Sequence, residues 1–242
     1  MENGGRVLPQ KDLHTLLEHY APSAKLRRRI EHLTRLAGGS VEPGLNPKFD
    51  DMVSASEAAE AIYTFHSERI PMTLQCERYA LKQYLMYDPS TQPATVLRLR
   101  TRRTRIFTQA RPPGYHAIMT MSSLLRMPGG QLDLVKEQAR HLLHLLDATP
   151  SLTLRVLDFA APIPFVDSDF TLLVMPNRRD DMVYVPFGLD GHTIKDKAKI
   201  DERVAYWRQA EQAALTEDET RDLLRSLADQ GMETAMTTRR GA

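Results

Sequence analysis

Arginine is the residue type most concentrated in one part of this sequence. Between Asp88 and Asp133 the chain carries seven arginines, no lysine and no acidic residue. Three of these arginines recur at helical spacing and share one side of a helix: Arg98, Arg102 and Arg105. Guanidinium groups bind phosphates and carboxylates through two parallel hydrogen bonds. The stripe therefore predicts either a grip on an anionic partner or ion pairs within the fold, for example with residues 158–229, which hold 15 acids and 9 bases.

A second set of side chains with metal-coordinating atoms lies further along the chain. Glu137, His141 and His144 are spaced by four and then three residues, so that one face of a helix carries all three. The apolar positions of the same segment lie on the opposite face, which favours a solvated polar face over a metal site. We therefore predict no metal and no cofactor.

The other residues that could do chemistry indicate no particular reaction. The sequence has none of the short motifs that bind phosphate or dinucleotides, or that mark zinc proteases and serine hydrolases. Cys76 is the single cysteine, which excludes an internal disulfide, and nothing near it predicts a reactive thiolate. Aspartates such as Asp169 lie near turns, where Asp is common for backbone reasons. Tyr184 and Trp207 are expected to be core aromatics.

Composition limits the class of protein. The 242 residues are 42 % hydrophobic and 26 % charged, with a net charge of +1, which is typical of a soluble globular chain. No apolar run is long enough for a membrane span, and the first residues do not resemble a secretory signal. We expect a cytoplasmic protein that has no contact with membranes.

The pattern of apolar residues predicts the elements that must position these side chains. Periodicity near 3.6 predicts helices over 9–20, 23–37, 51–67, 74–87, 95–110, 131–146, 199–215 and 216–229. Alternation predicts strands over 115–121, 152–159, 170–175 and 182–187, with a short edge at 192–194. Residues 40–50 are rich in turn formers and read as a linker. Because several strands follow one another through turns, we expect an α+β fold, with a small antiparallel sheet flanked by helices and preceded by a short N-terminal helical segment.

Seven segments, in order, carry a resemblance to one family. The segment IPMTLQCERYA (70–80) is similar to V-P-G-L-L-Q-T-x-x-Y-A, and the pair Arg102 and Arg105 is similar to R-x-x-R-Q. The other five segments are SSLLR (122–126), EQARHLLHLL (137–146), DFTLLVMP (169–176), MVYVP (182–186) and AALTEDETRDLL (213–224). Together they resemble bacterial XRE-type helix-turn-helix regulators that carry a long C-terminal domain of uncharacterised function, often labelled antitoxin-like transcriptional regulators.

The first residues fit this resemblance in part. The segment ENGGRVLPQKDLHTLLEHY is similar to the end of an XRE DNA-binding domain, whose recognition helix would lie upstream of Met1. The resemblance implies that residues 1–40 are a remnant of that domain, 41–230 an α+β ligand- or partner-binding domain, and 231–242 a flexible tail. Binding to DNA is expected only if the native protein includes the upstream helix-turn-helix. The chain departs from the family at Ser56, Ser122 and Pro186, where glutamate is usual, and at Ile106, where glutamine is usual.

Two functions follow as hypotheses. The first is a non-enzymatic regulatory domain that binds a small-molecule ligand or a protein partner, with the very small protein commonly encoded beside relatives, or a second copy of the chain, as candidates. The second is a regulator-derived enzyme of specialised metabolism that uses the same pocket. The expected contact surface includes the arginine helix and loops 109–114 and 160–169. The candidate binding residues are Arg98, Arg102, Arg105, Tyr115, His116, Ser122, Asp169 and Tyr184.

Overall fold

The computed structural model describes residues 19–20, 47–187 and 190–231. Backbone packing divides the chain into two units, residues 1–51 and 52–242, which are treated separately. In the first unit, His19 and Tyr20 are helical. The rest of the predicted helices 9–20 and 23–37 and nearly all of the predicted tail lie outside the described residues. The predicted linker 40–50 is wrong at its end, because a helix begins at Pro47.

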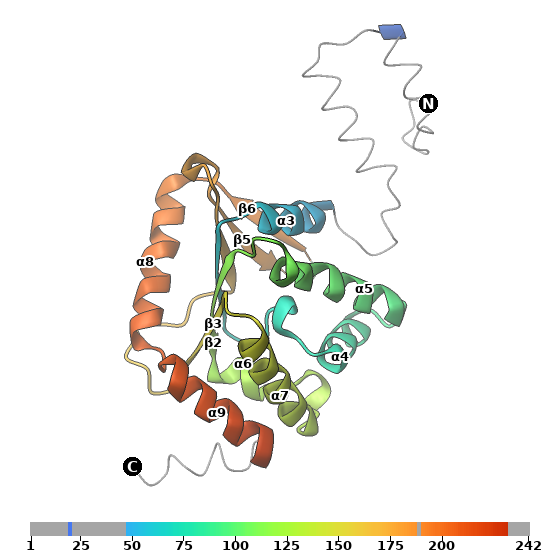
Figure 1. Cartoon of the computed structure of the whole chain (residues 1–242), viewed down its shortest axis with the longest axis vertical. Coiled ribbons are helices and arrows are strands. Elements are labelled where there is room, and N and C mark those ends of the chain that lie inside the picture. The colour runs from blue at the N-terminus through green and yellow to red at the C-terminus, as the bar shows by residue number, and fades with distance from the viewer. Residues whose placement is uncertain (1–18, 21–46, 188–189, 232–242) are drawn as a thin grey trace. The chain divides into compact units, whose positions relative to one another are not determined.

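A six-stranded sheet forms the centre of the second unit (Figure 1). Its strands are β1 (Ala61–His66), β2 (Gly114–Thr120), β3 (Leu152–Leu157), β4 (Phe170–Val174), β5 (Met182–Phe187) and β6 (Asp190–Ile194). They lie in the order β3-β2-β1-β4-β5-β6. Strands β1, β2 and β3 are parallel to one another, whereas β4, β5 and β6 continue the sheet in antiparallel pairs.

Seven α-helices are present among the described residues. They are α3 (Pro47–Ala58), α4 (Glu77–Tyr87), α5 (Pro93–Thr104), α6 (Met121–Leu125), α7 (Asp133–Ala148), α8 (Lys197–Ala213) and α9 (Glu217–Gln230). Helices α4 and α5 connect β1 to β2, and α6 and α7 connect β2 to β3, because parallel strands need such crossovers. The α+β class is confirmed, but the prediction of a small antiparallel sheet is wrong, since the sheet is large and mixed.

The error in the sheet comes from a single segment. A helix was expected over 51–67, but α3 ends at Ala58 and residues 61–66 form β1. This segment, AIYTFH, is rich in aromatic and β-branched residues, which suit a strand. Strand β1 is hydrogen-bonded along both edges, to β2 and β4, and it shows no clean alternation because Thr64, Phe65 and His66 are all buried. Because the sequence predicts these residues to be helical, it does not predict the parallel pairing of β1 with β2.

Each face of the sheet is covered by a different set of helices (Figure 1). One core holds side chains from α4 and α7 together with β1, β2 and β3, and it includes Ile62 and Leu142. Helix α9 joins this core by packing against α7 and β3. The other core lies beneath α8 and includes Phe65, Phe170 and Trp207. Alternate residues of each strand therefore face α4 and α7 or α8.

The remaining predicted elements are confirmed within a few residues. The strand pair β4 and β5, the edge strand β6 and helices α4, α5, α7, α8 and α9 lie where the sequence places them. A capping box opens α9, with Thr216 and Glu219 each accepting the other's backbone N–H. Within the part of the chain that the structure describes, no helix is long and apolar enough to cross a membrane.

Candidate functional site

Polar side chains gather where β1 ends and β4 begins. This strand-end cluster consists of His66, Ser67, Arg69 and Asp169. Asp169 Oδ1 accepts hydrogen bonds from the backbone N–H (2.8 Å) and the hydroxyl (2.9 Å) of Ser67. Its Oδ2 accepts one from Arg69 Nε (2.9 Å) and lies 3.2 Å from His66 Nδ1. Burial alone would raise the pKa of Asp169, but the contacts with this histidine, serine and arginine hold it well below its usual range.

Ser122 lies at the same edge of the sheet, where β2 ends. Its hydroxyl donates to Glu68 Oε1 (3.0 Å), and Arg126 Nε lies 2.6 Å from Glu68 Oε2. Thr120 caps α6 and donates its hydroxyl to the backbone oxygen of Ser67. The structure thus brings two predicted site residues, Ser122 and Asp169, to the carboxyl ends of parallel strands, which is where α/β sheets commonly bind ligands. Both side chains make hydrogen bonds within the chain, which join the ends of the strands.

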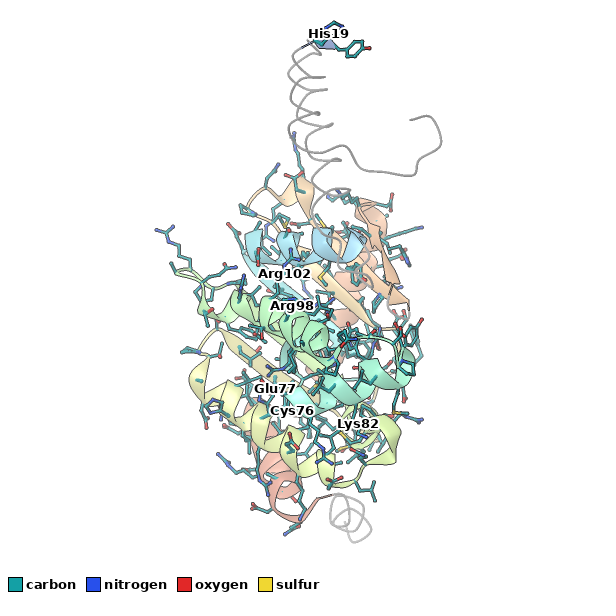
Figure 2. All side chains as sticks on the ribbon, turned by 90° about the vertical axis from the view of Figure 1, so that its right-hand side faces the viewer. His19, Cys76, Glu77, Lys82, Arg98 and Arg102 are labelled. Carbon is teal, nitrogen blue, oxygen red and sulfur yellow. The ribbon has the colours of Figure 1, made fainter. Side chains whose placement is uncertain are left out.

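The predicted arginine stripe lies on α5, which carries Arg98 and Arg102, and on the 3-10 turn after it, which begins at Arg105. Arg98 and Arg105 are exposed and Arg102 is half-buried. Figure 2 labels Arg98 and Arg102 in a view of this side of the molecule. Arg98 Nη2 donates to Thr95 Oγ1, one turn earlier (3.2 Å). The outer side of this helix is therefore strongly basic.

The inner side of α5 fastens it to α4 and α7. Arg100 Nε donates to the backbone oxygen of Gln75 (2.6 Å), and its Nη2 lies 3.2 Å from His141 Nε2. Its Nη1 is 4.0 Å from Glu77. Arg100 therefore contacts α4, the turn before α4, and α7. The sequence offers residues 158–229 as the example of acidic partners for ion pairs within the fold.

The face of α7 that carries possible metal ligands is partly covered. Glu137 pairs with Arg78 (3.3 Å), and His141 is half-buried beside Arg100. Burial, followed by the positive charge of this arginine and the neighbouring His144, lowers the pKa of His141 to about 4. The described residues hold no group of three metal ligands. The expectation of a solvated face is correct for His144, which is exposed, and wrong for His141.

The predicted tyrosines lie on the face of the sheet toward α4 and α5. Tyr115 is buried and its hydroxyl lies 2.6 Å from Thr73 Oγ1. Strand register places Tyr184 on the same face, and both tyrosines act electrostatically on Arg103 of α5. His116, the next residue after Tyr115, points to the opposite face. The residues that the enzyme hypothesis groups in one pocket therefore lie on two faces and one edge of the sheet.

His116 belongs to a cluster of three aromatic rings on the face that α8 covers. Its ring stacks on Tyr63, with centroids 4.7 Å apart, and Trp207 meets the Tyr63 ring edge-on at 4.8 Å. Tyr63 is not among the predicted site residues, because the sequence predicts residues 61–66 to be helical, and Trp207 is predicted to be a core aromatic. Reading residues 61–66 as a strand would have placed Tyr63 and His116 side by side.

An apolar loop, defined here as residues 159–166 (FAAPIPFV), is exposed next to α8. Phe159 is 74 % exposed, Phe165 60 % and Val166 54 %. Tyr206 of α8 fixes the loop, because its hydroxyl accepts the Asp167 N–H (2.8 Å) and its ring stacks on Phe165 at 5.7 Å. The predicted contact loop 160–169 contains most of the apolar loop. The eight consecutive apolar residues of the apolar loop can be read directly from the sequence.

The thiol of Cys76 is inert in this fold. Gln138 of α7 spans the turn before α4: its Oε1 accepts the Cys76 N–H and its Nε2 donates to the Leu74 backbone oxygen, both at 2.8 Å. Burial raises the pKa of the Cys76 thiol to about 11. The segment 70–80, which carries part of the family resemblance, is thus a structural junction between β1, α4 and α7.

Comparison with known proteins gives one family match. A family model described as a domain of unknown function (DUF5753) matches residues 49–226. No curated protein and no solved structure matches the chain. The matched range covers nearly all of the helices and strands described above.

Proposed function

Because this chain belongs to the family of the domain of unknown function DUF5753, we propose that its α+β unit is a regulatory module that binds a protein partner. The proposal combines the motifs similar to those of XRE-type regulators with one structural observation, the apolar loop. In relatives of this type, such a module would act on an attached DNA-binding domain. Binding of DNA by this polypeptide itself is proposed only for a form that includes the upstream helix-turn-helix.

The exposed apolar loop is the main observation that supports the proposal. Contiguous exposed apolar surface is uncommon on soluble proteins and commonly marks an interaction site. Tyr206 and an ion pair between Arg203 and Asp167 fasten the loop to α8. A surface that is already ordered loses less conformational entropy when it binds a partner. Phe159 and Phe165 would be its anchors, because aromatic side chains dominate the binding energy of protein interfaces.

The partner we propose is the very small protein that is commonly encoded beside relatives of this type. An apolar groove on that protein would accept the two phenylalanines. The exposed arginines of α5 offer a second contact to acidic residues of the same partner, which would speed association more than it would increase affinity. Self-association of the chain through the loop is the other outcome that the test below separates.

The test is isothermal titration of this chain with the very small protein proposed as its partner. We expect saturable binding that Phe159→Ser combined with Phe165→Ser weakens at least about tenfold, the usual loss at an interface anchor. The matched control is Leu132→Ser, which removes an equally exposed apolar side chain at the start of α7. Sedimentation of the chain alone detects a homodimer. Absence of heat, or binding that the loop variant leaves unchanged, would contradict the proposed role of the loop.

The enzyme hypothesis gains no support from the placement of its residues. A shared pocket would need Tyr115, His116 and Asp169 to converge, but strand geometry directs the first two to opposite faces. The third is held by Ser67 and Arg69 with its pKa well below the usual range, so it is a poor general base near neutral pH. We therefore favour the regulatory module.

A further inference from the structure

The three aromatic rings beneath α8 form a partly open cluster that the proposed function does not use. Tyr63, His116 and Trp207 come from β1, β2 and α8 respectively. The rings of Tyr63 and His116 stack with an interplanar angle of 20°, and Trp207 lies edge-on to both, at 4.8 and 6.4 Å. Trp207 is buried, whereas the other two are half-buried and retain solvent contact. The cluster therefore presents the aromatic rings of Tyr63 and His116 to solvent beside the buried ring of Trp207.

Two polar atoms of these rings bear on what the cluster could bind. The indole N–H of Trp207 is buried and has no hydrogen-bond acceptor among the described residues. A buried donor without an acceptor costs about 1–3 kcal/mol, and such groups commonly mark the place of a water, ion or ligand. The second atom is His116 Nε2, which lies close to Gly114, at a position where a Cβ on that glycine would be 3.0 Å away.

The histidine is held in one orientation. Its Nδ1 is 2.9 Å from Thr153 Oγ1 on the neighbouring strand β3. Burial lowers the pKa of His116, with the nearby carboxylates of Glu211 and Glu217 opposing the shift. One ring nitrogen is therefore held by Thr153, and the other lies beside Gly114. The same two carboxylates make the surroundings unfavourable for a negatively charged ligand.

We propose that Tyr63, His116 and Trp207 form a binding site for a small neutral aromatic molecule that carries a carbonyl acceptor. The ring of the ligand stacks on the half-exposed aromatic surface, where offset stacking contributes beyond the area buried. Its carbonyl oxygen accepts the indole N–H, which satisfies the buried donor. The site lies on the face of the sheet that α8 covers and shares no residue with the apolar loop, so either proposal can fail without the other.

Trp207 is the only tryptophan of the chain, so its fluorescence reports on this site alone. The experiment titrates the full chain with benzamide and compares it with benzoate and benzylamine, which have a similar ring but carry a charge. We expect a saturable change in tryptophan emission with benzamide and weaker binding of both benzoate and benzylamine, the latter because it has no carbonyl acceptor. Tyr63→Leu, which removes the stacking ring, should weaken benzamide binding at least about fivefold.

Two further variants separate loss of the site from loss of the fold. Thr153→Val removes only the hydroxyl that orients His116 and should weaken binding even if Tyr63→Leu does not fold. Trp207→Phe removes the indole N–H, and ligand-observed NMR should then show benzamide binding about 2 to 10 times more weakly, the usual value of one hydrogen bond. The matched control is Gln209→Ala, which changes an exposed residue of α8 but none of the three rings.

The outcomes decide the proposal. Saturable binding that these site variants weaken and Gln209→Ala leaves unchanged supports it. An emission change that never saturates, or equal binding by the wild type and Thr153→Val, overturns it, as does preference for benzoate. Because the apolar loop is intact in all site variants, titration with the small partner protein should remain unchanged in them.

Discussion

Replacement of Asp169 by Asn tests whether the strand-end cluster joins the two halves of the sheet. The carboxylate is 12 % exposed and accepts hydrogen bonds from Ser67 and Arg69. Asparagine keeps the size of the side chain and an oxygen for Ser67. It removes the negative charge and presents either an amide N–H or a neutral oxygen to the guanidinium. The variant therefore isolates the charge that links β1 to β4.

The expected loss of stability can be estimated from these contacts. A hydrogen bond to a charged group contributes about 1.5–3 kcal/mol, and breaking a fully buried ion pair costs about 3–5 kcal/mol. Arg69 is 29 % exposed, so solvent recovers part of this cost. We expect Asp169→Asn to lower the free energy of unfolding by about 2–3 kcal/mol. For a domain of this size the change corresponds to a decrease in Tm of roughly 4–12 °C.

Urea unfolding as a function of pH checks both the size and the cause of this effect. The pKa of Asp169 is lower in the folded than in the unfolded chain, so its contribution is complete above the unfolded value and is lost as the pH falls through the folded value. The gap between wild type and variant should be constant from about pH 8 to pH 5 and should narrow below about pH 4. The control Asp147→Asn, an exposed partner of Arg221, should cost less than about 1 kcal/mol. Equal stability of wild type and Asp169→Asn at pH 7 would refute the reasoning.

Three further predictions concern other parts of the fold. Thr216→Ala should lower the free energy of unfolding by about 1 kcal/mol, because it removes the N-cap of α9, and Thr193→Ala on β6 serves as an exposed control. NMR titration of His141 should give a midpoint near pH 4; since its folded pKa is lowered, the stability it contributes is lost as the pH falls from about 6.5 toward 4, and a midpoint near 6.5 would contradict the burial described here. The Cys76 thiol should react with a disulfide reagent at pH 8 at least roughly 100 times more slowly in the native than in the urea-unfolded chain, and equal rates would show that it is not buried.

The sequence predicted most local structure but not the arrangement of the sheet. Helices such as α7 and α9 could be predicted because they are amphipathic, and α9 begins with a capping box that depends on four consecutive residues. Strand β1 could not, because it is a central strand whose last three residues are all buried, so its burial follows no period of two. Its pairing with β2 depends on residues about 50 positions away, which no local pattern records.

The same distinction between local and long-range structure applies to the candidate sites. The exposed arginines of α5 and the apolar loop could be predicted, because one helical face and one continuous segment carry them. The strand-end cluster joins residues 100 or more positions apart, and only Asp169 and Ser122 of that edge were selected. The three-ring cluster needs the register of β1 against β2 and the position of α8, so His116 alone was selected and neither Tyr63 nor Trp207 was.

The proposed regulatory role depends most directly on the apolar loop as a docking surface. Isothermal titration with the proposed small partner protein measures this in one experiment, using the wild type and the variant that carries serine in place of Phe159 and Phe165. The account predicts saturable heat for the wild type and at least about tenfold weaker binding for the variant. Equal affinities for the two proteins, or no heat for the wild type, would contradict it.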